Sequence, residues 1–436
     1  MPDADLDVII VGATAAGMAA AARLAKAGHR VGLVTEGRPP GGVWAARPLA
    51  GSPGPALVDD APAVITLPAA WRDLFRKSGR PMDAELARAG WELVPAPPPI
   101  HRFPDGTELT LPTDRGEQFA TLSTAYGSTV AAAWRDLIDD LDQVWQALRP
   151  LGLESELHGR FQLTRSIESI MKRGRSLERL AREFAHPALA AIITDLAYPL
   201  GSDPTSTPAH CAVELSMLRR FGRWTVRRTD GAEAGRTSAL IEILTGRLAT
   251  RKVIMIDDPV AEIMIDTAGR ASGVITAAGP VRARSVIGAV DPPRLYDELL
   301  GRLPLRPQRA TLARLRPALA PTVTARAVTG ERSSEVRELI EHRPGTGPLI
   351  TVRRPAAETM IEIRYDYAAT RPDWRHGLAW QGYDSWLLRP PIRGPVPGLY
   401  VAGPFSAAGP GLSQTLLSGA LASYACHDDL LTSSVS

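Results

Sequence analysis

The chain has 436 residues, of which 44% are apolar, so it is long enough for two or three globular domains with full cores. Its 50 basic and 47 acidic side chains leave a formal charge of +3, which is too small to favour a nucleic-acid partner. A charge of this size permits weak contact with an anionic membrane surface without requiring it.

The N-terminal segment follows the pattern of a strand–helix–strand unit that binds a dinucleotide. A buried strand over residues 7–11 leads into a glycine turn, a helix that runs to Lys26 and a second strand over residues 31–35. Gly12 allows the tight turn, Gly17 allows the helix to pack closely on the strand, and Glu36 stands where a carboxylate accepts hydrogen bonds from a ribose. The residues predicted to meet the dinucleotide here are Gly12, Thr14, Ala15, Ala16, Gly17 and Glu36.

Thr14 stands where this pattern has its middle glycine, which normally lets the backbone approach a pyrophosphate. A β-branched side chain adds bulk at this turn, and its stiff χ1 limits its escape. Its hydroxyl can instead donate to a phosphate oxygen. The alternative is therefore an ordinary crossover unit that binds no ligand.

The middle of the chain mixes turns, extended pieces and helices. Asp105-Gly106 between two extended pieces predicts a hairpin, and the apolar spacing over residues 132–148 predicts a helix. Trp134 and Trp145 belong to the apolar stripe of that helix. The stripe favours core packing over the lining of a substrate tunnel. Other expectations are a loop over 38–56 and helices over 69–78 and within 176–218.

The last 200 residues carry a second set of strands and a final helix. Strands are expected over residues 253–256, 260–265, 271–277 and 281–287, after a helix over 237–250. Residues 322–328, 349–352 and 359–365 are weaker candidates. A strand running into Gly403 precedes a loop of small residues over 404–410 and a helix over 412–424, with Ser413 near its start as a cap.

Other polar groups favour structural roles. The histidines have no metal-ligand spacing, so no metal site is expected. Arginines surround Trp224 and suit either an anionic group, a membrane surface or an exposed basic turn, and the exposed turn is favoured. Asp139, Asp140 and Asp142 are most simply the solvated face of a helix. The arginines are Arg219, Arg220, Arg223, Arg227 and Arg228.

Cysteine use and the absence of targeting segments favour a cytoplasmic protein. Cys211 and Cys426 lie far apart and form no redox spacing, which suits a reducing compartment. Asp3 and Asp5 lead directly into the first strand, so no signal peptide is expected, and no run of 18 apolar residues predicts a membrane span. Richness in Ala, Arg, Gly and Pro is typical of a GC-rich bacterial genome.

Together these segments resemble the phytoene desaturase-like group (carotenoid desaturases and isomerases) of the amine-oxidase-like FAD/NAD(P)-binding flavoproteins. The resemblance covers roughly three quarters of the chain and is weakest in the middle helices and in residues 305–390. It is carried by the N-terminal unit, Gly41-Gly42 with residues 57–75, Phe103 to Thr107, residues 258–263 with Gly273-Val274 and Asp291-Pro292, and residues 398–422.

The resemblance implies an α/β fold in which a discontinuous Rossmann-like domain binds FAD and a second, α+β domain with a helical region binds substrate. The FAD domain would comprise residues 1–68, 235–300 and 395–436, and the substrate domain residues 69–234 and 301–394. Carried over by position, the resemblance adds these cofactor-binding residues: Gly41, Gly42, Val260 through its backbone, Gly403, Pro404, Gly411, Leu412 and Ser413.

The implied activity is that of an FAD-dependent oxidoreductase, a desaturase or a redox-neutral isomerase, acting on a largely apolar isoprenoid or polyene. No side chain can be assigned as a catalytic base, and the sequence does not indicate an oligomeric state. Val43 stands where an Arg or Lys usually follows the Gly-Gly pair, and Thr14 replaces a glycine. The alternative is therefore a relative with weakened or lost flavin binding that acts as a non-redox isomerase, a cyclase or a binding subunit.

Overall fold

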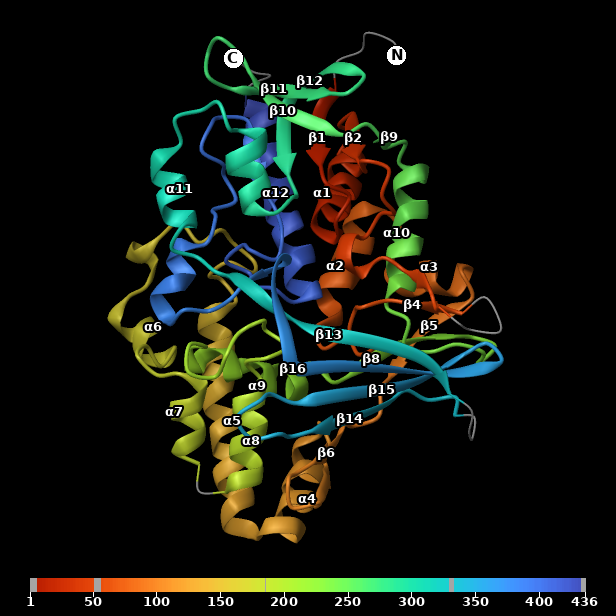
Figure 1. Ribbon diagram of the computed structural model, residues 1–436, viewed down its shortest axis with the longest axis vertical. Helices are drawn as coiled ribbons and strands as arrows, with labels where there is room; N and C mark the ends of the chain where they lie inside the picture. The colour runs from red at the N-terminus through yellow and green to blue at the C-terminus, as the bar shows by residue number, and fades with distance from the viewer. Residues whose placement is uncertain (1–5, 51–55, 185, 329–332, 433–436) are drawn as a thin grey trace.

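The protein is elongated, with a mostly parallel, mixed sheet and its helices at one end and a mostly antiparallel sheet with a helical region at the other (Figure 1). The computed structural model describes residues 6–50, 56–184, 186–328 and 333–432. The predicted α/β fold class, a Rossmann-like unit combined with an α+β part, is confirmed. The limits of the two domains remain a prediction.

The first sheet has seven strands in the order β10-β11-β12-β1-β2-β9, with β17 also paired to β12. β1 runs parallel to both β2 and β12, so that Ile9 lies opposite Gly32 on one side and Val286 on the other. β17 is parallel to β12, and β9 is parallel to β2. Segments far apart in the chain therefore form one sheet. The strands are β1 (Leu6–Val11), β2 (Val31–Val34), β9 (Ile254–Ile256), β10 (Val260–Ile265), β11 (Ala271–Thr276), β12 (Gly279–Gly288) and β17 (Leu399–Val401).

The first and last helices of the described chain pack against each other beside this sheet (Figure 1). α1 (Ala15–Lys26) is rich in alanine, and α12 (Leu412–Thr432) presents Gly419 to it. A Cβ at Gly419 would lie 2.3 Å from the carbonyl oxygen of Ala16, so only glycine allows this approach. α2 (Pro68–Ser78) and α10 (Ser238–Thr250) also contact α1. These helices bury one continuous apolar core with β1 and β2.

The second sheet has six strands in the order β13-β16-β15-β14-β6-β7. Its long antiparallel pair, β13 and β16, spans the waist of the molecule in Figure 1. β13 is an edge strand of this sheet. This position suits Pro321, because proline has no backbone N–H to donate and an edge strand has a neighbour on one side only. The strands are β6 (Ile100–Arg102), β7 (Glu108–Thr110), β13 (Pro317–Val328), β14 (Arg337–Glu341), β15 (Leu349–Ala356) and β16 (Thr359–Leu378), with small two-stranded sheets of β3 (Arg47–Pro48) with β4 (Leu57–Val58) and of β5 (Trp91–Pro95) with β8 (Trp224–Arg228).

A helical region packs around α5 (Ser128–Leu148), the long helix at the lower end of Figure 1. Trp134 and Trp145 on this helix are 1% and 4% exposed within one apolar cluster, so the favoured core role of the tryptophan stripe is confirmed. The remaining helices are α3 (Met82–Arg88), α4 (Arg115–Tyr126), α6 (Arg165–Ile170), α7 (Leu177–Arg182), α8 (Pro187–Asp195), α9 (Val213–Phe221) and α11 (Arg306–Leu312), with a π-helical turn over Arg294–Leu299.

Most predicted elements form within a few residues of their expected limits, including the hairpin at Asp105-Gly106. The predicted strand over 359–365 is too short, because β16 continues to Leu378, and the final helix continues from Tyr424 to Thr432. Residues 51–55 of the expected loop lie outside the described residues. Within the described ranges, no helix is both long enough and apolar enough to cross a lipid bilayer.

Candidate functional site

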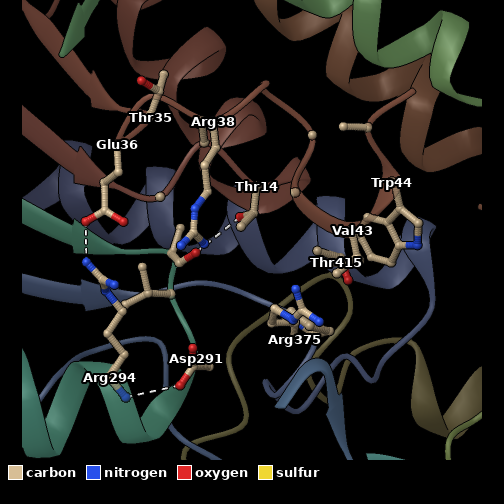
Figure 2. A pocket seen from close by; sticks show the side chains of 18 of the residues that line it. Thr14, Thr35, Glu36, Arg38, Val43, Trp44, Asp291, Arg294, Arg375 and Thr415 are labelled. Atoms are coloured by element: carbon tan, nitrogen blue, oxygen red, sulfur yellow. Dashed lines mark hydrogen bonds and ion pairs between the residues drawn. The ribbon is translucent and has the colours of Figure 1, made fainter. Parts of the chain in front are cut away.

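A cavity of about 340 Å³ opens at the carboxyl ends of four parallel strands of the first sheet. Gly12 follows β1, Glu36 follows β2, Asp291 follows β12, and Pro404 follows β17, and all four residues line it. Figure 2 shows Glu36 and Asp291 in this lining. In sheets of this kind, ligands bind outside the carboxyl ends of the strands, where the strand order reverses. β1 lies at such a point, because the chain leaves it for β2 on one side and returns to β12 on the other.

The turn from β1 into α1 forms one wall of the cavity. A Cβ at Gly12 would lie 2.6 Å from the carbonyl oxygen of Ala289, and a Cβ at Gly17 would lie 2.1 Å from the carbonyl oxygen of Gly12. Both positions therefore require glycine, as the sequence predicts. Ala15 and Ala16 are fully buried in the first turn of α1 and do not line the cavity.

Thr14 lines the cavity and also caps the N-terminus of α1. Its hydroxyl accepts a hydrogen bond from the backbone N–H of Gly17 and donates one to the carbonyl of Ala289, both at 3.3 Å. Thr14 is therefore the N-cap of α1 and ties the turn to the end of β12. In this arrangement the hydroxyl is engaged within the protein.

The Gly41-Gly42 pair lies beside the same turn and lines the cavity. The N–H of Gly41 donates to the carbonyl of Ala13 at 2.7 Å. Gly41 has a φ of +113°, and a Cβ there would lie 2.7 Å from Ile241. The pair thus lets a loop cross the start of α1 without side chains between them. Val43 and Trp44 follow it into the lining.

Glu36 lies in the cavity, but its carboxylate is already engaged. It forms an ion pair with Arg294, and the two side chains are 14% and 25% exposed. Its Oε1 also accepts a hydrogen bond from the backbone N–H of Val260 at 3.3 Å. Two residues predicted for the cofactor therefore contact each other, and Val260, at 5% exposure, does not line the cavity.

The C-terminal segment reaches the cavity through Pro404, Phe405 and Thr415. Gly403 lies just behind this wall, where its N–H donates to the hydroxyl of Ser418 at 2.9 Å. The Thr415 hydroxyl is buried and has no hydrogen-bond partner among the described residues. A buried polar atom of this kind is rare in proteins unless water or a ligand satisfies it.

Three of the predicted C-terminal residues do not line the cavity: Gly411, Leu412 and Ser413. The expectation that Ser413 caps the final helix is also wrong. Its hydroxyl donates to the carbonyl of Leu67 at 3.2 Å, because Ser413 is the second residue of α12 and faces α2.

Several residues of the lining were not predicted from the sequence. Arg38, Arg294 and Arg375 reach the cavity from three separate segments (Figure 2). Arg375 pairs with Asp373 at 2.8 Å, whereas the exposed Arg38 has no ion pair among the described residues. None of these arginines lies in a recognisable pattern, although Arg38 directly follows the Glu36-Gly37 step. Trp44 and Trp374 add apolar surface.

The arginines around Trp224 form structural ion pairs, and Arg223 among them is buried. Each contacts a carboxylate: Arg219 contacts Asp139 at 2.6 Å, and Arg220 contacts Asp142 at 2.7 Å. The arginines therefore have structural roles, but the expected exposed turn is wrong, because most of them lie on α9 and β8. The expectation for the aspartates holds, since they lie on the partly exposed face of α5. The other pairs are Arg223 with Glu338, Arg227 with Glu92 and Arg228 with Asp230.

Comparisons with known proteins identify relatives of this chain. A family model described as FAD dependent oxidoreductase matches residues 7–95. A phytoene desaturase (neurosporene-forming) from Cereibacter sphaeroides is 26% identical over 311 residues, which is 70% of this chain and 57% of the relative. The resemblance to the phytoene desaturase group is confirmed. A hydroxyneurosporene desaturase from the same organism is 29% identical over 67% of this chain and 58% of its own length.

The chain thus spans less than two thirds of the length of the curated desaturases it matches. Among solved structures, cyclohexylamine oxidase from Brevibacterium oxydans has a TM-score of 0.64 at 17% identity, and the match covers 98% of this chain and all of that one. An oxidoreductase from Methanosarcina mazei has a TM-score of 0.63 at 14% identity, covering 95% of this chain and 98% of that one. At such identities these structures establish the fold alone.

Proposed function

We propose that the protein is an FAD-dependent oxidoreductase, a desaturase or a redox-neutral isomerase, that acts on a largely apolar substrate. The observation that carries this proposal is the cavity at the carboxyl ends of β1, β2, β12 and β17, which opens beside the N-terminus of α1. The match of residues 7–95 to the FAD-dependent oxidoreductase model supports the cofactor.

The residues of the cavity fit a flavin dinucleotide. The pyrophosphate would lie at the start of α1, where free N–H groups and the helix dipole favour negative charge. Glu36 would accept hydrogen bonds from the adenosine ribose after separating from Arg294. The isoalloxazine would lie along the wall that holds Pro404, Phe405 and the unpartnered hydroxyl of Thr415.

This arrangement supports the proposed division of the chain. The cavity combines residues from 12–45, 289–294 and 404–415, all within the segments assigned to the FAD domain, with Trp374 and Arg375 from β16. The segments 1–68, 235–300 and 395–436 are proposed as that domain. Residues 69–234 and 301–394 are proposed as the substrate domain.

The apolar substrate is proposed from the names of the relatives and from the surroundings of the cavity. Both reported desaturases carry the names of polyene substrates or products. The bound flavin would supply hydride-accepting chemistry. The protein would contribute position, by holding a C–H bond against the cofactor, and a dry wall from Trp374, Phe405 and Trp44. A cytoplasmic location with peripheral membrane contact is proposed with it.

Two contacts favour the second candidate, a relative with weakened or lost flavin binding that acts as a non-redox isomerase, a cyclase or a binding subunit. Thr14 places a side chain in the turn where a pyrophosphate would approach. The ion pair between Arg294 and Glu36 occupies the carboxylate that would bind the ribose. Each feature would lower the affinity for FAD without removing the site.

The absorption spectrum of the purified protein, followed by FAD titration, tests the proposal. We expect substoichiometric flavin in the wild type and higher occupancy in Thr14→Gly, because relief of overpacking is worth about 1–3 kcal/mol. Thr14→Ser keeps the hydroxyl cap and removes only the methyl group, so its occupancy should rise as well if bulk is the cause.

Full and tightly held flavin in the wild type would contradict the weakening by Thr14. If neither the wild type nor either variant takes up flavin at high FAD concentration, the flavin-free candidate replaces the oxidoreductase. Occupancy that rises in Thr14→Gly alone would show that the hydroxyl, rather than the methyl group, hinders the cofactor.

A further inference from the structure

A second hollow, of about 530 Å³, lies at the opposite end of α1 from the cavity described above. It is bordered by the end of α1 at Lys26, the turn between α2 and α3 at Gly79, and the last turns of α10 at Arg247 and Arg251. None of these residues lines the cofactor cavity. The hollow is therefore a separate feature of the surface.

The hollow carries a large excess of positive charge. Five cationic side chains line it, and Glu85 is the one carboxylate among the described residues of its lining. Glu85 contacts Arg247 at 2.8 Å and Arg80 at 3.6 Å. The other three cations have no ion pair among the described residues, and they are Lys26, Arg88 and Arg251.

The base of the hollow is formed by the buried side chain of Arg247 and its contacts with neighbouring backbone. The side chain of Arg247 is 4% exposed, and its guanidinium donates to the carbonyls of Phe75 and Arg80 at 3.5 and 3.4 Å. A Cβ at Gly79 would lie 1.6 Å from one terminal nitrogen of Arg247 and 3.0 Å from one of Arg251. The missing side chain at Gly79 therefore lets two guanidinium groups converge at the same place.

The described residues around the hollow neutralise this charge only in part. α1, α3 and α10 end at the hollow, and each helix C-terminus contributes about half a negative charge. Together with Glu85 these ends offset about half of the five positive charges. Burial lowers the pKa of Arg247, and the charges of Arg251 and Arg80 lower it further, whereas Glu85 raises it. The remaining excess suits a multiply charged anion.

We propose that this hollow binds a phosphate group. Arg247 is engaged within the protein and supplies positive charge at the base, while the guanidinium of Arg251 beside it and the exposed Lys26 and Arg88 supply donors for phosphate oxygens. Phosphate in turn supplies more than one negative charge. The group can belong to a soluble phosphate compound or to the headgroup of an anionic lipid, and both present the same chemistry to the hollow.

The test compares the wild type with Lys26→Glu/Arg88→Glu, which reverses two exposed charges and leaves the buried Arg247 in place. The matched control is Arg306→Glu/Arg371→Glu, which alters net charge equally at two exposed arginines outside the hollow. Inorganic pyrophosphate is titrated by calorimetry, and sedimentation with phosphatidylglycerol vesicles is measured in parallel at the same salt concentration.

We expect the wild type and the control to bind at least one probe, and the hollow variant to bind it about ten-fold or more weakly. Loss of pyrophosphate binding assigns a soluble phosphate, and loss of sedimentation alone assigns the lipid headgroup. Pyrophosphate bound at the start of α1 is unaffected by either variant. The proposal is overturned if the wild type binds neither probe, or if the two variants behave alike.

Discussion

The ion pair between Arg294 and Glu36 should compete with the cofactor, so removing the arginine should strengthen FAD binding. Arg294→Gln is the change, because glutamine keeps a polar side chain and removes the charge. Glu36 would then be free to accept hydrogen bonds from a ribose. The wild-type protein must first break the pair.

The size of the effect follows from the exposure of the pair. The side chains of Glu36 and Arg294 are 14% and 25% exposed, so both remain near water. A pair of this kind is worth about 1 kcal/mol, which corresponds to an FAD dissociation constant roughly five-fold lower in the variant. Added salt screens the ion pair, so it should reduce the difference between the FAD dissociation constants of the wild type and the variant.

Quenching of FAD fluorescence on titration with protein measures this constant. Arg302→Gln is the control, because it removes a mostly exposed arginine that pairs with Glu262 outside the cavity. Weaker FAD binding by Arg294→Gln would refute the reasoning and show that Arg294 contacts the cofactor itself. Equal affinities would show that the pair opens at no cost.

Two further predictions concern stability. Gly419→Ala should lower the unfolding free energy by about 1–3 kcal/mol, because its Cβ would lie 2.3 Å from the carbonyl oxygen of Ala16. Gly246→Ala, on the open side of α10, should instead add up to about 1 kcal/mol, and equal thermal shifts in both would contradict the packing argument. Burial raises the pKa of Glu214 from 4.5 to about 7, so its contribution to stability is present below pH 4.5 and is lost as the pH rises through 7. Glu214→Gln should therefore be more stable than the wild type at pH 8, by up to about 3 kcal/mol, and no more stable at pH 4. Urea unfolding at both pH values measures this, and a constant difference would count against a shifted pKa.

Local sequence patterns predicted the strands of the first sheet and the glycine turns beside the cavity, since each of these has a strong signal. Gly12 and Gly17 are required by contacts with nearby backbone, and the apolar strands that flank them are fully buried. The confirmed elements include β10, β11 and β12, whose turn residues mark their ends.

Long-range pairing could not be predicted in the same way. β16 runs for 20 residues, but its second half alternates weakly and is partly exposed, so no period marks it. The ion-pair partner of Glu36 is Arg294, which lies 258 residues further along the chain. A contact of this kind depends on how the strands are ordered, and no local pattern encodes it.

The order of the strands in the first sheet also determines how long its first strands lack their partners while the chain is being synthesised. β1 and β2 are complete by Val34, but β12 begins at Gly279 and β17 at Leu399. β12 is the second partner of β1, and at about 5–20 residues per second the ribosome reaches it roughly 10 to 50 s after β2. During that interval β1, whose residues Val8 to Val11 are fully buried in the finished protein, has an unpaired edge. We therefore expect the nascent chain to need protection from association until the last helix closes over the first.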